Sequence, residues 1–364
     1  MNNDKRIYDL AVLIGRFQPF HNGHRFAIQR AMQMANHVLV LVGDTGGPRT
    51  TKDPWTFTER RQMIMRAMPS DTVSAPDCAP RVIIHQLMDD PNDQEWLANV
   101  QAEVAEAEIT IGAVNSVVLV GHNKDQSSYY LKMFPQWDFK DTGYDLLYGG
   151  NDSIEYRVDA TEIRELYFKD RLQYATGVLP REVLDHMMYL HSMNRPEFEE
   201  LKMEYEAVQK YRKSWAAAPF PPVFVTTDAV VIQSGHILMV KRGERPGKGL
   251  WALPGGFIDQ TETIEDCAIR ELIEETEINL QPEVLRRCIK HVQVFDRAGG
   301  VSSMDRGRII THAHLIKLDD SKELPKVRGA DDAEEAKWIP IADLDGRQIF
   351  SDHFKIIRSI LGKL

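Results

Sequence analysis

Two histidines near the start of the chain, His21 and His24, are three residues apart where a loop is expected to pass into a helix. The preceding loop, residues 15–20, contains a glycine and a proline that let the backbone approach a ligand closely. Free amides at a helix start attract anions, histidines add donors that can be cationic, and Arg16 adds a fixed charge. This combination suits the binding of a triphosphate whose phosphorus is attacked by a nucleophile. Two histidines at this spacing, taken alone, are more often ordinary surface or core residues.

A second set of charged residues lies past the middle of the chain. Glu271, Glu274 and Glu275 are spaced i, i+3 and i+4, so on a helix they share one face. Crowded carboxylates destabilise a helix unless a cation is bound, and hard divalent metals prefer oxygen ligands. Glu262 and Arg270 at fixed offsets distinguish the pattern from a solvated acidic helix face. The pattern predicts magnesium, or manganese, held against a pyrophosphate group.

The first half of the chain alternates between short apolar runs and helical stretches. Such alternation indicates a parallel sheet with right-handed crossovers, and ligands bind at the carboxyl ends of its strands. Both 15–24 and 121–125 fall at such ends. The expected strands are 8–14, 37–42, 81–87 and 116–120, and the expected helices include 23–35 and 94–107.

A proline cluster at 215–222 marks the expected domain junction, because it follows a charged helical stretch. Beyond it we expect a hairpin around Ser234 and Gly235, a helix over 263–276 and further mixed strands. The expected organisation is α/β throughout. It comprises a Rossmann-like domain with a parallel sheet over 1–180, a helical segment and linker over 181–222, and an α/β/α domain with a mixed sheet over 223–364.

Bulk properties limit the classes of partner. The chain has 364 residues, enough for two domains, and its formal net charge of -10 argues against general affinity for nucleic acid. The three cysteines, Cys78, Cys267 and Cys288, show no paired spacing, and no apolar run is long enough for a membrane span. We expect a cytoplasmic protein with small nucleotide ligands and no membrane partner; a homo-oligomer is left open.

The N-terminal decapeptide, residues 15–24, resembles the signature of the nucleotidyltransferase superfamily, whose H-x-G-H motif binds ATP phosphates. Its form, GRFQPFHNGH, is similar to that of nicotinamide mononucleotide (NMN) adenylyltransferases of the archaeal type. The resemblance implies that His21, His24 and Arg164 are catalytic. Thr161 would bind ATP and cap the helix that carries Arg164, and the role of Asp159, where the family usually has serine, is open. The implied ATP-binding residues of the loop are Gly15, Arg16, Phe17 and Gln18.

Other segments fit the same resemblance. Asn92 would read the carboxamide of the mononucleotide, and Trp96 would stack on its pyridinium ring, although Trp96 alone suits a core position as well. Gly121 and Lys124 would contact the nucleotide, with a solvated lysine as the alternative for Lys124. The segment 53–60 matches the family's Asn-Pro-aromatic…Glu-Arg segment, with Asp53 in place of asparagine.

The second set of residues resembles the Nudix box in all but one position. The resemblance implies that Gly256, Glu271, Glu274 and Glu275 hold the metal, with Glu274 also catalytic. Glu277 stands where the box has glycine, which suggests that the helix runs longer or ends differently. Arg297 and Arg308 fall in segments similar to those of ADP-ribose-cleaving members, and would hold a diphosphate or a terminal ribose unless they form a charged surface loop.

From end to end the chain resembles bacterial fusions of an NMN adenylyltransferase with an ADP-ribose pyrophosphatase. The resemblance implies that ATP and NMN give NAD and pyrophosphate, and that ADP-ribose is split into AMP and ribose 5-phosphate with magnesium. Two alternatives stay open. The first domain could use another phosphorylated acceptor, such as phosphopantetheine. The second could cleave another nucleoside diphosphate derivative or be a non-catalytic sensor of a NAD metabolite.

Overall fold

The structure is a computed structural model that describes residues 7–44, 46–73, 80–90, 92–122, 130–142, 159–296 and 307–362. The chain forms two compact units, one within residues 1–202 and the other within 203–364, and residues 46–51 group with the second. The division falls inside a single helix, α7 (Arg195–Ser214), between Lys202 and Met203. Within the described ranges, no helix combines the length and apolarity needed to cross a membrane.

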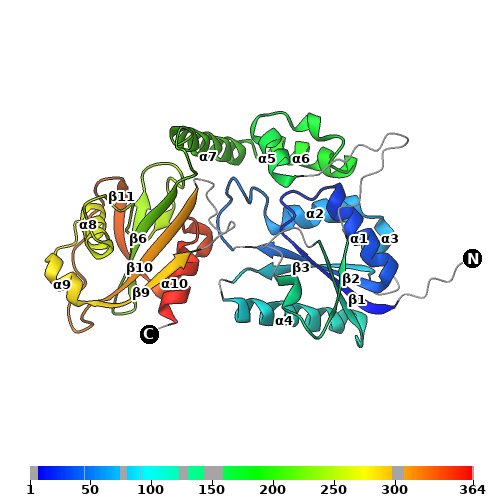
Figure 1. The fold of residues 1–364 in the computed structure, drawn as a ribbon, viewed down its shortest axis with the longest axis horizontal. Coiled ribbons are helices and arrows are strands. Elements are labelled where there is room, and N and C mark those ends of the chain that lie inside the picture. The colour runs from blue at the N-terminus through cyan, green and yellow to red at the C-terminus, as the bar shows by residue number, and fades with distance from the viewer. Residues whose placement is uncertain are drawn as a thin grey trace, which may run out of the picture. The chain divides into compact units, whose positions relative to one another are not determined.

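The first unit contains the expected parallel sheet (Figure 1). The strand order is β3-β2-β1-β4-β5, with every neighbouring pair parallel. The strands are β1 (Tyr8–Gly15), β2 (Ala35–Asp44), β3 (Val82–Met88), β4 (Val117–Gly121) and β5 (Asp138–Asp141). The helices are α1 (Asn22–Met34), α2 (Phe57–Ala67), α3 (Ser70–Val73), α4 (Asp93–Ile111), α5 (Ala160–Phe168) and α6 (Arg181–Met193), with the 3₁₀ turn η2 (Leu172–Ala175).

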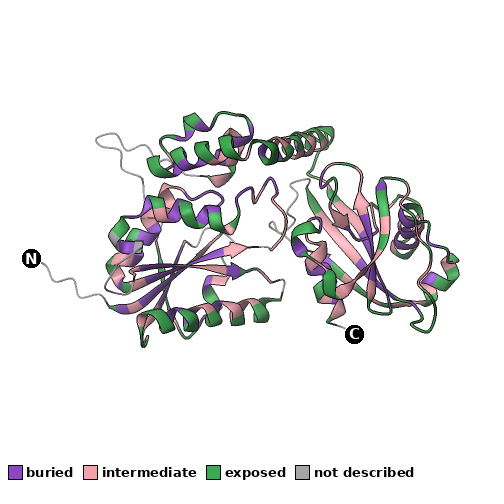
Figure 2. Ribbon diagram, turned by 180° about the vertical axis from the view of Figure 1, so that it is seen from behind, coloured by how far each residue is buried: buried purple, intermediate pink, exposed green. Residues whose placement is uncertain are grey.

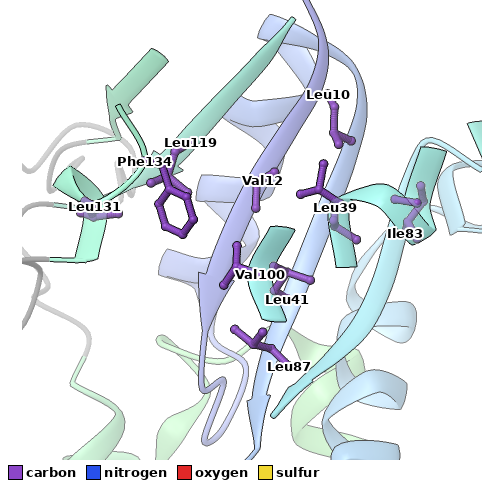
Figure 3. Packing of buried hydrophobic residues seen from close by; sticks show 12 residues of the cluster. Leu10, Val12, Leu39, Leu41, Ile83, Leu87, Val100, Leu119, Leu131 and Phe134 are labelled. Carbon is purple, nitrogen blue, oxygen red and sulfur yellow. The ribbon is translucent and has the colours of Figure 1, made fainter. Parts of the chain in front are cut away.

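Helices on both faces bury the central strands, so β1 and β2 read as nearly continuous apolar runs. Figure 2 shows buried residues concentrated on the strands and exposed residues on the outer sides of the helices. Figure 3 shows one side of this core, where Leu10, Val12, Leu39 and Leu41 from the strands meet Val100 from α4. This packing fixes the strand ends from which the functional loops emerge.

The second unit contains the expected mixed sheet, with strand order β11-β7-β6-β10-β9 and β8 paired to β7. The strands are β6 (Val223–Gln233), β7 (His236–Arg242), β8 (Trp251–Ala252), β9 (Ile289–Asp296), β10 (Arg308–Lys317) and β11 (Ala333–Pro340). Strands β6 and β10 are parallel and the other pairs are antiparallel. The expected hairpin joins β6 to β7 through Ser234 and Gly235, both with positive φ.

Helices cover both faces of the second sheet. Helix α8 (Ile264–Thr276) packs through Ile269 and Leu272 onto one face, and α10 (His353–Leu361) packs through Ile356 and Ile357 onto the other. The remaining elements are α9 (Pro282–Arg287) and the 3₁₀ turns η3 (Ile341–Asp343) and η4 (Gly346–Gln348). The apolar side of α8 faces the core, and Glu274 lies on its exposed side.

Candidate active sites

The two histidines of the first site are fixed at the start of α1. His21 is the N-cap residue, and its main-chain N–H donates to Nδ1 of His24 at 3.3 Å. The two imidazole rings stack with their centroids 3.6 Å apart. Because Nδ1 of His24 accepts a hydrogen bond, the proton of the neutral ring lies on Nε2. His24 therefore offers one N–H donor at the positive end of a helix dipole.

Burial decides the charge of His24. Desolvation lowers the pKa of His24 well below its ordinary value of 6.5, and the neighbouring His21 lowers it further. His24 is therefore a neutral donor near neutral pH, which corrects the expectation that this ring can be cationic. Fixed charge comes instead from Arg16, whose side chain is 43% exposed and lies 3.5 Å from Asp53 and 3.9 Å from Asp89.

We expect the first unit to lose stability as the pH falls below the ordinary histidine range. The unfolded chain gains a proton at His24 near pH 6.5, whereas the folded ring stays neutral to a much lower pH. The unfolded state then binds more protons, so the free energy of unfolding falls with the pH. Thermal unfolding of the native chain and of His24→Gln between about pH 7 and about pH 5 measures this. Equal pH slopes for the two proteins would contradict the expectation.

A buried arginine ties the loop after β1 to its neighbours. Arg60, on α2, is 2% exposed. Its Nη1 donates to the carbonyls of Arg16 at 2.8 Å and Gly43 at 2.6 Å, and its Nε donates to the Thr56 carbonyl at 3.2 Å. Asp44 lies 3.7 Å from its Nη2. One guanidinium thereby joins the ends of β1 and β2 to the start of α2.

Replacing Arg60 with methionine is expected to lower the free energy of unfolding of the first unit by about 3 kcal/mol. Three carbonyl groups lose this donor and Asp44 loses its nearby cation, while the apolar stem is kept. Denaturant unfolding measures the change. Arg61→Met, at the next and exposed position of α2, is the matched control and is expected to be neutral.

The loop side chains Phe17 and Gln18 have structural partners of their own. Gln18 is 4% exposed, and its amide both donates to the Trp55 carbonyl at 2.9 Å and accepts from the Trp55 N–H at 3.1 Å. Phe17 has a φ of 53° and its ring contacts His24 at 4.7 Å between centroids. A Cβ at Gly15 would come 3.0 Å from the Phe17 ring, so glycine leaves the ring its place. These residues shape the loop, and their contact with ATP stays a prediction.

The start of α5 comes to the same loop, as the resemblance implied. Arg164 donates through Nη1 to the Gln18 carbonyl at 2.7 Å and through Nη2 to Oγ1 of Thr161 at 3.2 Å. The expectation that Thr161 caps the helix is wrong. The N-cap is Asp159, whose carboxylate accepts from the Thr161 N–H at 2.8 Å. Asp159, whose role the sequence left open, therefore fixes the helix start that carries Arg164.

The residues expected to hold the mononucleotide lie on α4. Asn92 is exposed and is the N-cap residue, with Oδ1 accepting from the Gln94 N–H at 2.9 Å. Trp96 is partly buried and packs against Tyr130 and Phe134, with centroids 5.7 Å and 6.1 Å away. Trp96 thus also contributes to the core, and the recognition of the pyridine ring by these two residues stays a prediction.

The end of β4 is closely packed. A Cβ at Gly121 would come 2.8 Å from the Leu131 side chain, and the Gly121 carbonyl accepts from the Thr142 N–H at 2.9 Å. A larger residue at Gly121 would therefore displace Leu131.

Two predicted site residues, Lys124 and Arg297, lie outside the described residues.

In the second unit, a single arginine organises the acidic face of α8. Arg270 donates through Nε and Nη2 to the Glu262 carboxylate at 2.9 Å and 2.7 Å. Its Nη1 donates to Glu271 at 2.8 Å and to Glu274 at 2.9 Å. The hydrogen bonds from Arg270 hold the pKa of Glu262 down to about 2. Glu262 is therefore a permanently charged anchor for Arg270, which in turn orients two of the predicted metal ligands.

The remaining carboxylates are more buried. Glu275 is 4% exposed and accepts from the Gly255 N–H at 2.8 Å. Burial raises the pKa of Glu275 to about 9, and the negative charges of Asp332 and Glu271 contribute. Burial also raises the pKa of Glu271. Carboxylates this buried and this close together favour a bound cation.

The predicted donor set on α8 suits a divalent metal. All its side chains offer oxygen, which hard cations prefer, and a Cβ at Gly256 would overlap the Glu271 carboxylate. Across the described part of the chain, no three acidic, histidine or cysteine side chains already converge on one point. Arg270 holds Glu271 and Glu274, so these two must turn for a cation to enter. The chemistry of the donors fits magnesium or manganese.

Glu277, which stands where the Nudix box has glycine, ends helix α8 in the left-handed conformation that glycine favours. Glu277 has φ 43° and ψ 35°, the left-handed C-cap conformation, and its N–H donates to the Ile273 carbonyl at 2.8 Å. Arg328 donates two hydrogen bonds to its carboxylate, at 2.7 Å and 2.6 Å. The expectation that the helix runs longer or ends differently is wrong, because α8 ends at Thr276.

Arg308 begins β10, beside the described end of β9. Its Nη2 donates to both carboxylate oxygens of Asp296, at 2.9 Å and 3.1 Å, and its side chain is 46% exposed. An exposed guanidinium at a strand start can still exchange this partner for a phosphate. Its contact with a diphosphate or a ribose stays a prediction.

Some residues that shape the sites carried no prediction. One is the pair of His353 and the buried Asp228, near the Gly255–Gly256 turn. Nδ1 of His353 accepts from the Leu253 N–H at 2.9 Å, and its Nε2 lies 4.0 Å from Asp228. The sequence did contain a sign of this pair, because Asp228 lies within the apolar strand β6 and a buried carboxylate needs a partner. Asp332, beside Glu275, offered no such signal because it stands in a charged loop.

Comparisons with known proteins agree with this geometry. The cytidylyltransferase-like family matches residues 12–136, and the NUDIX domain family matches residues 223–360. The nicotinamide/nicotinic acid mononucleotide adenylyltransferase of Acinetobacter baylyi is 35% identical over 165 residues, which are 45% of this chain and 78% of that protein. The ADP-ribose pyrophosphatase of Methanocaldococcus jannaschii is 31% identical over 140 residues, which are 38% of this chain and 72% of that protein.

A solved structure matches nearly the whole chain. It is a bifunctional NMN adenylyltransferase/ADP-ribose pyrophosphatase from Francisella tularensis, complexed with AMP and a manganese ion. The identity is 34% and the TM-score 0.81, over 98% of this chain and 99% of that one. The chain belongs to the bifunctional NMN adenylyltransferase/ADP-ribose pyrophosphatase family. The resemblance of the two motifs to this bifunctional family is confirmed.

Proposed function

We propose that the first domain joins ATP and NMN to give NAD and pyrophosphate. The observation that carries this proposal is the hydrogen bond from Arg164 to the Gln18 carbonyl, at 2.7 Å. It brings the cation of Arg164, on α5, to the loop that leads into His21 and His24 at the start of α1. Cations and donors from two distant segments thereby meet where a triphosphate can bind.

In the proposed reaction, an oxygen of the NMN phosphate attacks the α-phosphorus of ATP and the bond to pyrophosphate breaks. Negative charge builds on the phosphoryl oxygens and on the leaving group. His24 donates from Nε2, while Arg16 and Arg164 supply fixed charge. Position and charge neutralisation supply the acceleration, so no covalent intermediate with the protein is needed.

Isotope tracing tests the bond that breaks. With ATP labelled at the α-phosphate, the label should appear in NAD; with ATP labelled at the γ-phosphate, it should appear only in pyrophosphate. Label from the γ-phosphate in the dinucleotide would contradict adenylyl transfer. Labelled product with phosphopantetheine, and none with NMN, would establish the other acceptor.

We propose that the second domain hydrolyses ADP-ribose to AMP and ribose 5-phosphate. Gly256, Glu271, Glu274 and Glu275 would hold magnesium, with manganese as the alternative. When bound, the metal supplies Lewis acidity toward the diphosphate and lowers the pKa of water. Arg270, anchored by Glu262, keeps the carboxylates ordered before the metal arrives. The exposed Arg308 would bind the diphosphate or the terminal ribose.

Replacing Glu277 with glycine is expected to leave the rate of ADP-ribose hydrolysis unchanged. Glycine favours the left-handed C-cap conformation that Glu277 already adopts, so α8 and its carboxylates keep their places. Steady-state kinetics with ADP-ribose measure this. A rise of about tenfold or more in the rate of ADP-ribose hydrolysis would show that Glu277 impairs the Nudix site.

A further inference from the structure

An aromatic cluster lies at the start of β6, next to the Nudix box. It consists of Tyr211, Trp215, Phe224 and Phe257. Phe224 is its centre, with ring centroids 5.3 Å from Trp215, 5.8 Å from Tyr211 and 5.7 Å from Phe257. Two of the rings are well exposed, Trp215 at 44% and Phe257 at 37%, whereas Tyr211 and Phe224 are partly buried. Tyr211 and Phe224 thus make the packing contact, and the other two keep surface available for a flat ligand.

The cluster adjoins the residues that handle the diphosphate. Phe257 directly follows Gly256, and its carbonyl accepts from Nη2 of Arg270 at 3.3 Å. On its other side, Gly307 packs against the Phe224 ring, since a Cβ there would come 3.2 Å from Cε2. Arg308 follows Gly307 and pairs with Val223 in the sheet. The aromatic cluster therefore adjoins both predicted diphosphate-binding elements, the Nudix box at Gly256 and the start of β10 at Arg308.

Helix α7 is anchored to the second unit, which holds Trp215 in place. The Glu204 carboxylate accepts from Nη1 of Arg245 at 3.1 Å and from the Gly247 N–H at 2.9 Å. Trp215 follows the last residue of α7 and precedes the segment 223–360 that matches the NUDIX domain family. An element outside the Nudix fold thus brings an exposed indole to its active side.

We propose that Trp215 and Phe257 form the stacking surface for the adenine ring of ADP-ribose. The proposal rests on the proposed hydrolysis of ADP-ribose and names its base-binding subsite. Adenine presents a large planar face, and stacking on an aromatic side chain is favourable for every base. The diphosphate of a ligand stacked there continues toward Gly256 and Arg308, as cleavage requires. Trp215 is therefore a substrate-binding residue that the segment between the two domains supplies.

The test compares Trp215→Ala and Phe257→Ala with two controls, Trp215→Phe, which keeps a ring, and Phe220→Ala, which removes a 79% exposed ring outside the cluster. For each alanine variant of the cluster, the KM for ADP-ribose is expected to rise about tenfold with kcat little changed. Competitive inhibition by AMP should weaken by the same factor, and inhibition by ribose 5-phosphate should not. NAD formation by the same samples confirms that the chain is folded.

Equal weakening of AMP and ribose 5-phosphate inhibition, or no change in either, would overturn the stacking surface. Calorimetric titration with ADP-ribose and manganese keeps the test separate from the proposed hydrolysis. A native chain that binds ADP-ribose without cleaving it, and loses affinity in Trp215→Ala and Phe257→Ala, would retain the base subsite while the proposed activity fails. Unchanged calorimetric affinity in those two variants would overturn the subsite itself.

Discussion

Replacing His24 with alanine is expected to reduce NAD formation about 100-fold or more while ADP-ribose hydrolysis continues unchanged. The lost group is the Nε2–H of a neutral ring, which the hydrogen bond from the His21 N–H holds in one tautomer. A donor fixed in this way stabilises charge that develops only in the transition state, so its removal lowers kcat more than it raises KM. Steady-state kinetics with ATP and NMN measure the loss.

His24→Gln is the matched control for the fold. Glutamine at the third helical position can still accept from the N-cap N–H, so α1 keeps its capping box. At neutral pH, where His24 is uncharged in both the folded and the unfolded chain, we expect this variant to be as stable as the native chain and to recover only part of the activity. NAD formation by His24→Ala at the native rate would contradict the role given to His24.

Replacing Glu274 with glutamine is expected to reduce ADP-ribose hydrolysis about 100-fold or more, with NAD formation unchanged. An amide is a weaker ligand for a hard cation than a carboxylate, and Lewis acidity at the diphosphate accounts for several kcal/mol of the barrier. Glu274 is 48% exposed and contacts Arg270, so the change should cost little stability. The affinity for manganese, measured by calorimetry, should fall with the activity.

Glu265→Gln is the control on the same helix. Glu265 is 53% exposed and pairs with Arg286 at 3.1 Å. It is not one of the carboxylates that Arg270 contacts, which are Glu262, Glu271 and Glu274. This variant should hydrolyse ADP-ribose at the native rate and bind manganese with native affinity. Equal losses in both variants would show that helix α8, and not its metal face, had been damaged.

The central strands of both sheets could be predicted from the sequence, because buried strands leave continuous apolar runs. Strand β5 could not, since its four residues, Asp138 to Asp141, are all exposed and Phe139 is the single apolar residue among them. The spacing of the glutamates placed the acidic face of α8 because helix geometry is local. Local rules therefore account for the motifs and for most elements.

Contacts between distant segments could not be predicted. Arg60 matched a family segment, yet only the fold shows that it is buried and joins three carbonyls. The sequence alone left the role of Asp159 open, because an acidic group near phosphates is unfavourable. The structure shows that Asp159 is the N-cap residue of α5. Glu277 looked like a defect because a positive φ is rare for glutamate, and the backbone adopts it with Arg328 as a partner. The desolvation that keeps His24 neutral likewise depends on packing.

The central claim is that one chain carries two separate nucleotide activities. Chromatographic product analysis of the native protein with magnesium, in one mixture of ATP and NMN and another of ADP-ribose alone, tests it most directly. The account predicts NAD and pyrophosphate from the first mixture, and AMP and ribose 5-phosphate from the second. Absence of NAD from the first mixture, or intact ADP-ribose in the second, would contradict the function assigned to that domain.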